Sequence, residues 1–247
     1  MGIPNVGDDT PKSVSFAAEV GGRAQGVAAM TNLVPDGDKR AGLERSGAKI
    51  VAVAREAATA YVTRFLAEFF DSRIAWGKGR GVDRGFDAGV AAIGEKARTS
   101  LPDRNTANPE YRAIFKDGTT AEYTTPAIKQ DPDLAATLRR GIEASGLSAK
   151  TELLGMLDPL MPLVEAAAGG VRGAEEQVNH LFEVEMAARK KLVDVMWEER
   201  KTIEQLLGRG GRGVARFIFF DFRSPATPEA APVAPPVTTP AAVPAVR

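Results

Sequence analysis

The chain contains one histidine, His180, and its neighbours are the first residues whose spacing could support chemistry. Glu176 lies four residues before it and Glu183 three residues after it, so on a helix all three would share a face. Helical metal sites use this spacing of carboxylates and imidazole, but di-iron sites need two Glu-x-x-His motifs. One chain supplies only one, so a metal would have to be shared across a symmetric dimer. A solvated helix face explains the pattern more simply, and we expect no metal and no other cofactor.

Other catalytic arrangements find little support in the sequence. The chain has no cysteine, which excludes thiol nucleophiles, disulfides, zinc fingers and iron–sulfur clusters. A serine hydrolase would have to use His180, and no G-x-S-x-G segment is present. The 32 acidic residues offer many carboxylate pairs but none that the sequence singles out. We therefore expect a protein that is not an enzyme.

Two segments combine glycine with basic residues: WGKGRGVDRG over 76–85 and GRGGRG over 208–213. Neither is a P-loop, because no Ser or Thr follows Lys78, and neither follows a predicted strand. Guanidinium groups and exposed backbone amides nevertheless suit phosphate, and Gly/Arg segments with aromatic residues bind single-stranded nucleic acid. The interpretation we favour is that each segment ends a helix with cations that complement its dipole. The candidate anion or partner contacts are Lys78, Arg80, Arg84, Arg209, Arg212 and Arg216.

A phenylalanine-rich segment follows the second of these, with the sequence VARFIFFDF over 214–222. As a strand it would be apolar on both faces, which is typical of a buried strand. As an exposed segment flanked by arginines, it would be an association surface or would insert into a membrane interface. The candidate association surface is Phe217, Phe219, Phe220 and Phe222.

Two long helices must position these segments. Over residues 38–76, apolar or small residues recur in steps of three and four, which is the helical period (Leu43, Gly47, Ile50, Ala54, Ala57, Tyr61, Phe65 and Phe69, with a neighbouring stripe at Val51, Ala58, Val62, Leu66 and Phe70). Its alanine-rich first half would allow close helix approach, and its aromatic second half would fill a larger space. A second such pattern covers 173–208. Two helices of matched length predict an elongated bundle or a coiled-coil-like pair.

Shorter elements are expected between the long helices. Glycines at 77 and 79 would end the first long helix, and Gly169–Gly170 would separate a short helix from the second. Further short helices are predicted over 85–98, 133–144, 149–157 and 158–168. Residues 111–125 contain two β-prone runs around Lys116-Asp117-Gly118, which predicts a β-hairpin that would pair with the phenylalanine-rich strand.

The two ends of the chain differ from the middle in composition. Residues 1–37 are rich in Gly, Pro, Asp and Asn, and we expect a flexible N-terminal arm. Residues 224–247 hold seven of the sixteen prolines and few charges, which predicts a disordered Ala/Pro-rich tail. The fold class is therefore mainly α, with a helical domain over 38–223, a small β-hairpin or short sheet, and disordered ends.

The composition narrows the function classes. Basic and acidic residues number 32 each, so the net charge is zero and the surface as a whole offers no basic field for nucleic acid. No run approaches the ~18 uncharged apolar residues that a membrane-spanning helix needs, and we expect a cytoplasmic location. Our leading hypothesis is a structural or protein-interaction protein that associates with itself, or with another protein, through its long helices. The alternatives are a nucleic-acid or anionic-surface binder acting through the Gly/Arg segments, and a peripheral membrane or granule protein acting through residues 217–222.

Overall fold

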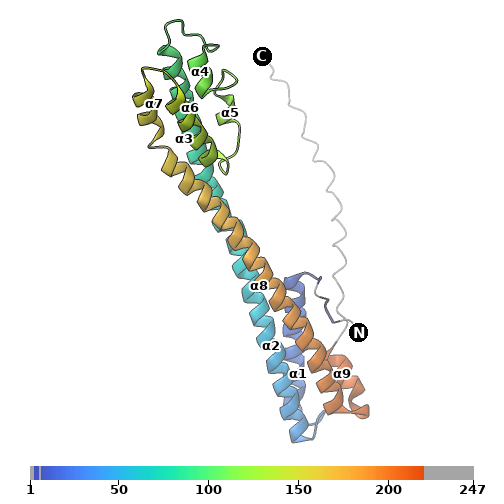
Figure 1. The fold of residues 1–247 in the computed structure, drawn as a ribbon. Helices are drawn as coiled ribbons and strands as arrows, with labels where there is room; N and C mark the ends of the chain where they lie inside the picture. Colours follow the sequence, from blue (N-terminus) through green and yellow to red (C-terminus); the bar gives the residue numbers. More distant parts are fainter. Residues whose placement is uncertain (1–2, 6, 220–247) are drawn as a thin grey trace, which may run out of the picture. The chain divides into compact units, whose positions relative to one another are not determined.

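The computed structural model describes residues 3–5 and 7–219, and over these ranges it contains helices and turns but no strand (Figure 1). The prediction of a mainly α chain with long helices is confirmed. The elements in chain order are α1 (Thr10–Ala29), α2 (Gly37–Leu66), the π-helical turn η1 (Ala67–Asp71), α3 (Ser72–Thr99), α4 (Pro109–Ile114), α5 (Ala121–Thr124), α6 (Asp131–Ala144), α7 (Lys150–Leu157), α8 (Met161–Leu207), the 3-10 turn η2 (Arg209–Gly211) and α9 (Arg212–Ile218).

The chain divides into two compact units, and both long helices contribute to each of them. The first unit combines Met1–Ala54 with Lys191–Arg247, and the second is Arg55–Lys190. Within the first unit α2 meets α8 through an ion pair between Lys49 Nζ and Glu199 Oε1 at 2.7 Å. Within the second, Arg64 Nε of α2 lies 2.5 Å from Glu185 Oε2 of α8. The two long helices therefore pack side by side, as their apolar stripes predict.

The first unit contains a helix where the sequence analysis predicts a flexible arm. Residues 10–29 form α1, and its buried side chains follow the helical period (Phe16, Ala17, Val20, Ala24 and Val27). They pack into a core with Leu43, Ile50, Leu192, Met196 and Ile203, all buried. The glycines that suggest a loop instead allow close contact, because a Cβ at Gly21 would lie 2.9 Å from the carbonyl oxygen of Gly47 on α2. Helix α1 therefore has an apolar stripe, but most of its residues are small (Ala, Gly and Val).

The second unit shows that the predicted β-hairpin over 111–125 is wrong. These residues form α4, a turn and α5. Asn108 caps α4 by accepting a hydrogen bond from the Glu110 backbone N–H at 3.0 Å, and Pro109 occupies its first turn. The predicted turn is present, with Gly118 at a φ of 73°. The β-prone residues serve as core instead: Tyr111, Ile114, Phe115 and Tyr123 are all buried.

The core that overrides this β-propensity is formed around α3, with α4 to α7 gathered along it (Figure 1). Side chains from the six helices α3 to α8 meet there, including Phe86, Ile93, Leu138, Leu153 and Val164. A single hairpin is marginal without such a partner surface, whereas these short helices bury apolar faces against α3 and against one another. Tertiary packing thus decides the local structure of this segment.

Two predicted helix boundaries are also wrong. Gly77 and Gly79 lie inside α3, and Gly169 and Gly170 lie inside α8. Gly79 is buried, and a Cβ there would lie 3.1 Å from Cγ2 of Val171 on α8. A glycine inside a helix costs about 1 kcal/mol relative to alanine, and the contact between α3 and α8 offsets that cost. Close packing, not helix termination, is the role of Gly79.

A cluster of three aspartates lies in the second unit. Asp83 and Asp87 occupy α3 one turn apart, and Asp131 begins α6. Asp131 is buried, and no donor within the described residues reaches either of its carboxylate oxygens or Oδ1 of Asp83. Burial, the charge and hydrogen bonding of Asp83, and the charge of Asp87 raise the pKa of Asp131 to about 7. Because no donor compensates the buried carboxylate, burial favours the neutral form of Asp131, and this is the direction of its raised pKa.

Candidate interaction surfaces

The most exposed apolar surface of the second unit lies along the end of α2, η1 and the start of α3. Six large side chains there are between 37% and 58% exposed, and we call them the apolar face (Val62, Phe65, Leu66, Phe69, Phe70 and Ile74). The rings of Phe65 and Phe69 stack with centroids 4.5 Å apart. These phenylalanines are exposed, so the prediction from their helical spacing that they are buried is wrong. The first half of the same stripe, from Leu43 to Ala57, is buried as predicted.

The π-helical turn shapes this face. Val62, Leu66, Phe70 and Ile74 are spaced four residues apart, and in an ideal α-helix such a row would drift by about 40° per step. The turn over Ala67–Asp71 holds more residues than an α-helical turn, so it reduces the drift across the middle of the row. The four side chains therefore stay closer to one side of the helix than their spacing alone implies.

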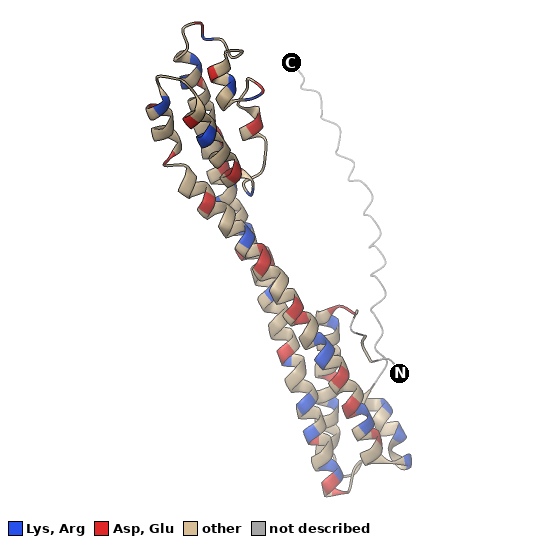
Figure 2. Ribbon diagram, in the orientation of Figure 1, with Lys and Arg blue, Asp and Glu red and all other residues tan. Residues whose placement is uncertain are grey.

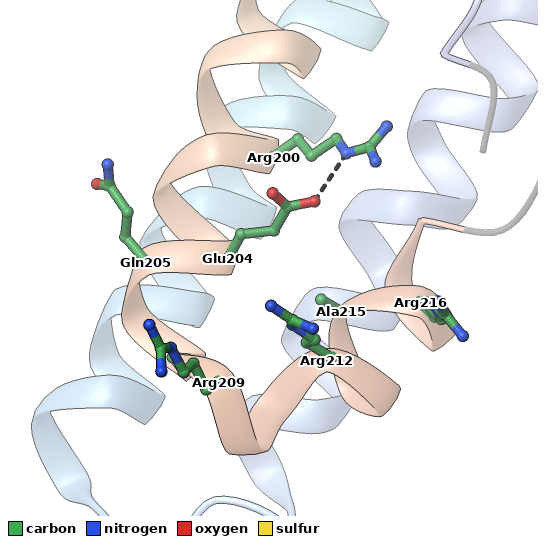
Figure 3. Close-up of a pocket in the computed structure, with 8 residues that line it drawn as sticks. Arg200, Glu204, Gln205, Arg209, Arg212, Ala215 and Arg216 are labelled. Carbon is green, nitrogen blue, oxygen red and sulfur yellow. Dashed lines mark hydrogen bonds and ion pairs between the residues drawn. The ribbon is translucent and has the colours of Figure 1, made fainter.

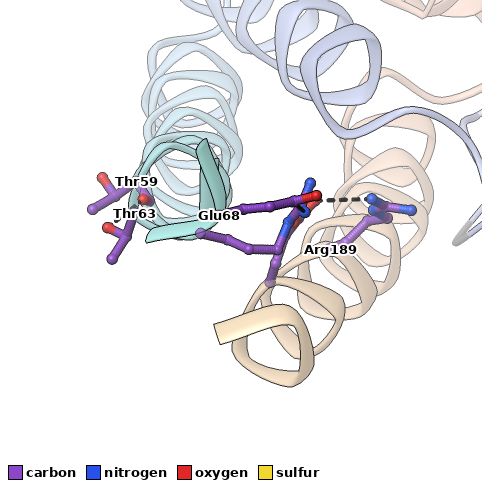
Figure 4. A network of polar contacts seen from close by, with 6 residues as sticks. Thr59, Thr63, Glu68 and Arg189 are labelled. Atoms are coloured by element: carbon purple, nitrogen blue, oxygen red, sulfur yellow. Dashed lines mark hydrogen bonds and ion pairs between the residues drawn. The ribbon is translucent and has the colours of Figure 1, made fainter. Parts of the chain in front are cut away.

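A polar network holds α2 against α8 beside the apolar face (Figure 4). Glu185 is 1% exposed, and its oxygens accept hydrogen bonds from Arg64 Nε at 2.5 Å and Arg189 Nη2 at 3.0 Å. Arg64 also pairs with Glu68. Thr59 and Thr63 point away from α8 in Figure 4, and each donates to the backbone carbonyl four residues earlier at 2.9 Å. The network fixes which side of α2 faces α8 and leaves the apolar residues outside it.

The apolar face continues toward α8 at two points. The Arg64 guanidinium carbon lies 5.9 Å from the ring centres of both Tyr61 and Phe182, and Phe182 is 50% exposed. At the other end, Ile74 lines a shallow groove of about 280 Å³ whose α8 side consists of small residues (Ala166, Ala167 and Gly170). Lys78, one of the predicted contact residues, lies on the rim of this groove.

The structure separates the predicted basic residues into two groups. Lys78, Arg80 and Arg84 are exposed along α3 of the second unit, and Arg209, Arg212 and Arg216 belong to η2 and α9 of the first. Figure 2 shows Lys and Arg positions interspersed with Asp and Glu positions along the described helices. Of the α3 group, Lys78 borders the groove beside Ile74.

The second group forms a pocket with the last turns of α8 (Figure 3). This arginine pocket has a volume of about 610 Å³ and is lined by Arg200, Glu204, Gln205, Gly208, Arg209, Arg212, Ala215 and Arg216. Arg200 and Glu204 extend from α8 into the space that Arg212 faces from α9. Arg200 Nε donates to Glu204 Oε1 at 2.9 Å. The sequence analysis misses Arg200 and Glu204, although their four-residue spacing places both on the helix face that meets α9.

Glycines create the turn that closes the arginine pocket. Gly208 has a φ of 64°, a conformation that residues with a Cβ rarely adopt. A Cβ at Gly211 would collide with Leu207. The predicted helix end at Gly208 is confirmed, because α8 stops at Leu207. The chain then turns and places α9 beside the helix end, so these glycines determine where the arginines meet.

The phenylalanine-rich segment is helical over 214–218 and Phe219 follows in a bend, so the predicted strand is wrong over 217–219. Ile218 and Phe219 are buried against the first unit, and Phe217 is 57% exposed. The Phe217 carbonyl accepts a hydrogen bond from Arg23 Nη1 at 2.9 Å, and that guanidinium lies 5.1 Å from the Phe217 ring centre. The predicted contacts Phe220 and Phe222 and the predicted tail over 224–247 lie outside the described residues.

His180 lies on α8, and it is exposed together with Glu176 and Glu183. Among residues 3–5 and 7–219, no group of three or more His, Asp or Glu side chains has a metal-binding arrangement. None of the helices over the same ranges is both long enough and apolar enough to cross a membrane.

Comparisons with known proteins identify no relative. No protein-family model, no curated protein and no solved structure matches this chain. Its function must therefore be argued from its own surfaces.

Proposed function

We propose that this protein is a self-associating structural or interaction protein, in which the apolar face packs against the same face of a second copy. The observation that carries the proposal is the exposure of six large apolar side chains within thirteen residues of one helical run. A contiguous exposed apolar patch of several hundred Å² is often a binding surface. The mixed charges along the same helices favour a protein partner over nucleic acid.

The size of the apolar face fits a small symmetric interface. Six side chains that are each about half exposed present roughly 500 Å² per copy, given the area that aliphatic and aromatic side chains bury. Two copies would then bury about 1,000 Å², which is the lower limit for a specific interface. Phe182 and Tyr61, which lie beside the face, would add to this area.

The spacing of the row suits a two-fold axis. An isologous interface brings residue i against j and j against i. With the axis at the midpoint of the row, Leu66 of each copy meets Phe70 of the other, and Val62 meets Ile74. Side chains four residues apart form the ridge that packs into the matching ridges of a second helix, most often at a crossing angle near −50°.

Replacing Leu66 by Asp is expected to weaken self-association by about 100-fold or more, because a carboxylate would be buried against an apolar partner. Sedimentation equilibrium over a range of concentrations measures the effect. Leu33→Asp is the matched control, since Leu33 is 49% exposed and Leu66 is 47% exposed. The control should associate like the unaltered chain. A chain that stays monomeric at high concentration, or equal behaviour of the two variants, would contradict the proposal.

Complementary charges offer a second test of the same pairing. Phe70→Lys should also be monomeric, whereas an equimolar mixture of Leu66→Asp and Phe70→Lys should form a 1:1 heterodimer. In that heterodimer the new carboxylate and ammonium face each other, and the unaltered Phe70 and Leu66 pair across the axis. A face that binds lipid or an unrelated protein gives no heterodimer, so vesicle binding without recovery on mixing would reject self-association.

A further inference from the structure

We propose that the arginine pocket binds a polyphosphate group, carried by a small molecule such as a nucleoside triphosphate or present as inorganic tripolyphosphate. This site lies in the first unit and is independent of the apolar face. The charge of the pocket, the anchoring of α9 and the volume of the pocket support this ligand class.

The pocket carries more positive charge than its own residues neutralise. Arg209, Arg212 and Arg216 make no hydrogen bond or ion pair within the described part of the chain, and Glu204 is the single carboxylate among the lining residues. Glu204 is already paired with Arg200, which also lies over the Trp197 ring at 5.6 Å. The C-terminal end of α8 contributes only about half a negative charge. At least two guanidinium groups are left for an anionic ligand.

The arginines project from η2 and α9, and α9 is anchored to the rest of the first unit. Arg209, Arg212 and Arg216 are spaced by three and four residues, so they project from one side of η2 and α9. The other side is anchored by Ile218 and Phe219, which are buried, and α9 packs against α1. Guanidinium groups bind phosphate oxygens through paired N–H donors, and holding several of them ready reduces the ordering cost of binding.

The size and shape of the pocket favour a small ligand over a nucleic-acid strand. A volume of about 610 Å³ falls within the ~300–1,000 Å³ of small-molecule sites. Strand binding instead needs a basic groove that follows the backbone, together with aromatic platforms for the bases. Along the described helices, acidic positions are interspersed with basic ones, which does not suit a continuous basic groove (Figure 2). Several linked phosphates can use arginines from both walls at once, which a single phosphate cannot.

Isothermal titration of the full chain with tripolyphosphate, ATP and AMP tests the proposal. We expect tripolyphosphate and ATP to bind and AMP to bind at least about tenfold more weakly, because each charged hydrogen bond that is lost costs about one order of magnitude. Tighter binding of ATP than of tripolyphosphate would identify a nucleotide ligand. Equal binding would identify the polyphosphate group alone.

A matched pair of double variants locates the site. Arg212→Ala/Arg216→Ala removes two exposed arginines four residues apart on α9, and Arg80→Ala/Arg84→Ala removes two with the same spacing and exposure on α3. The first should weaken tripolyphosphate binding by about tenfold or more, and the second should leave it unchanged. Absence of binding up to about 1 mM, equal weakening in both variants, or tighter binding of a single-stranded oligonucleotide than of tripolyphosphate would overturn the proposal.

Discussion

Replacing Asp131 by Asn is expected to stabilise the protein by about 2–3 kcal/mol more at pH 8 than at pH 5. Asp131 is 1% exposed and lies beside Asp83 and Asp87, and its pKa in the folded chain is raised to about 7. The unfolded chain returns this group to its ordinary pKa of 3.8. Urea unfolding of the unaltered chain and of the variant, at several pH values, measures the difference.

The sign of the effect follows from where the proton is bound. Between pH 4 and pH 7 the folded chain keeps a proton on Asp131 that the unfolded chain has lost. Each rise of one pH unit across this range therefore removes up to about 1.4 kcal/mol from the free energy of unfolding. Above pH 7 the buried carboxylate of Asp131 is charged, and the free energy of unfolding is reduced by the full cost of burying that charge. Asparagine avoids this cost, because it is neutral at every pH and can donate a hydrogen bond to Asp83.

Asp133→Asn is the control for this prediction. It removes the same charge from the same first turn of α6, but Asp133 is exposed. Its effect on stability should not change between pH 5 and pH 8. If Asp131→Asn gives the same difference in stability at both pH values, the carboxyl of Asp131 titrates normally and the interpretation of the aspartate cluster is wrong.

The helical class and the pairing of the long helices follow from the sequence because periodicity reports burial directly. Leu43, Ile50 and Ala57 recur at helical spacing and are buried. Where propensity and packing disagree, prediction from the sequence fails. Tyr111 and Tyr123 are β-prone, yet the surface of α3 gives helices over 109–124 a core to pack against. Nothing local to 111–125 reveals that surface, because most of its residues lie elsewhere in the chain.

Prediction of the candidate surfaces from the sequence is limited in the same way, because the packing of other helices decides which residues are exposed. A stripe of Phe65, Phe69 and Phe70 predicts burial, and only the partner helix decides whether that burial occurs within the chain. Here the Arg64–Glu185 pair fixes the other side of α2 against α8 and leaves the phenylalanines outside. The predicted arginines of 209–216 do converge on one pocket, but Arg200 and Glu204, which line it with them, come from the preceding helix. The sequence identifies the residue types, and the fold determines which of them meet.

The close crossing of α1 and α2 leads to the second large expected effect. Gly21→Ala and Gly47→Ala should each lower the free energy of unfolding by about 1–3 kcal/mol, which is the usual cost of overpacking. A Cβ at Gly47 would lie 2.7 Å from the carbonyl oxygen of Gly21, and a Cβ at Gly21 would lie 2.9 Å from the carbonyl oxygen of Gly47. Both clashes are with backbone atoms, so a change of rotamer cannot relieve them. Urea unfolding followed by circular dichroism measures the loss.

Two other glycines of α1 provide the control with the opposite sign. Gly22 and Gly26 are exposed, and a Cβ at either would meet no atom within 4 Å. Gly22→Ala and Gly26→Ala should therefore raise the free energy of unfolding by about 0.5–1 kcal/mol, because alanine restricts the unfolded chain and favours the helix. Neighbouring positions of one helix would then respond to the same substitution in opposite directions. If Gly21→Ala stabilises as much as Gly22→Ala, residues 10–29 do not pack against α2, and the flexible arm predicted from composition would describe them better than α1.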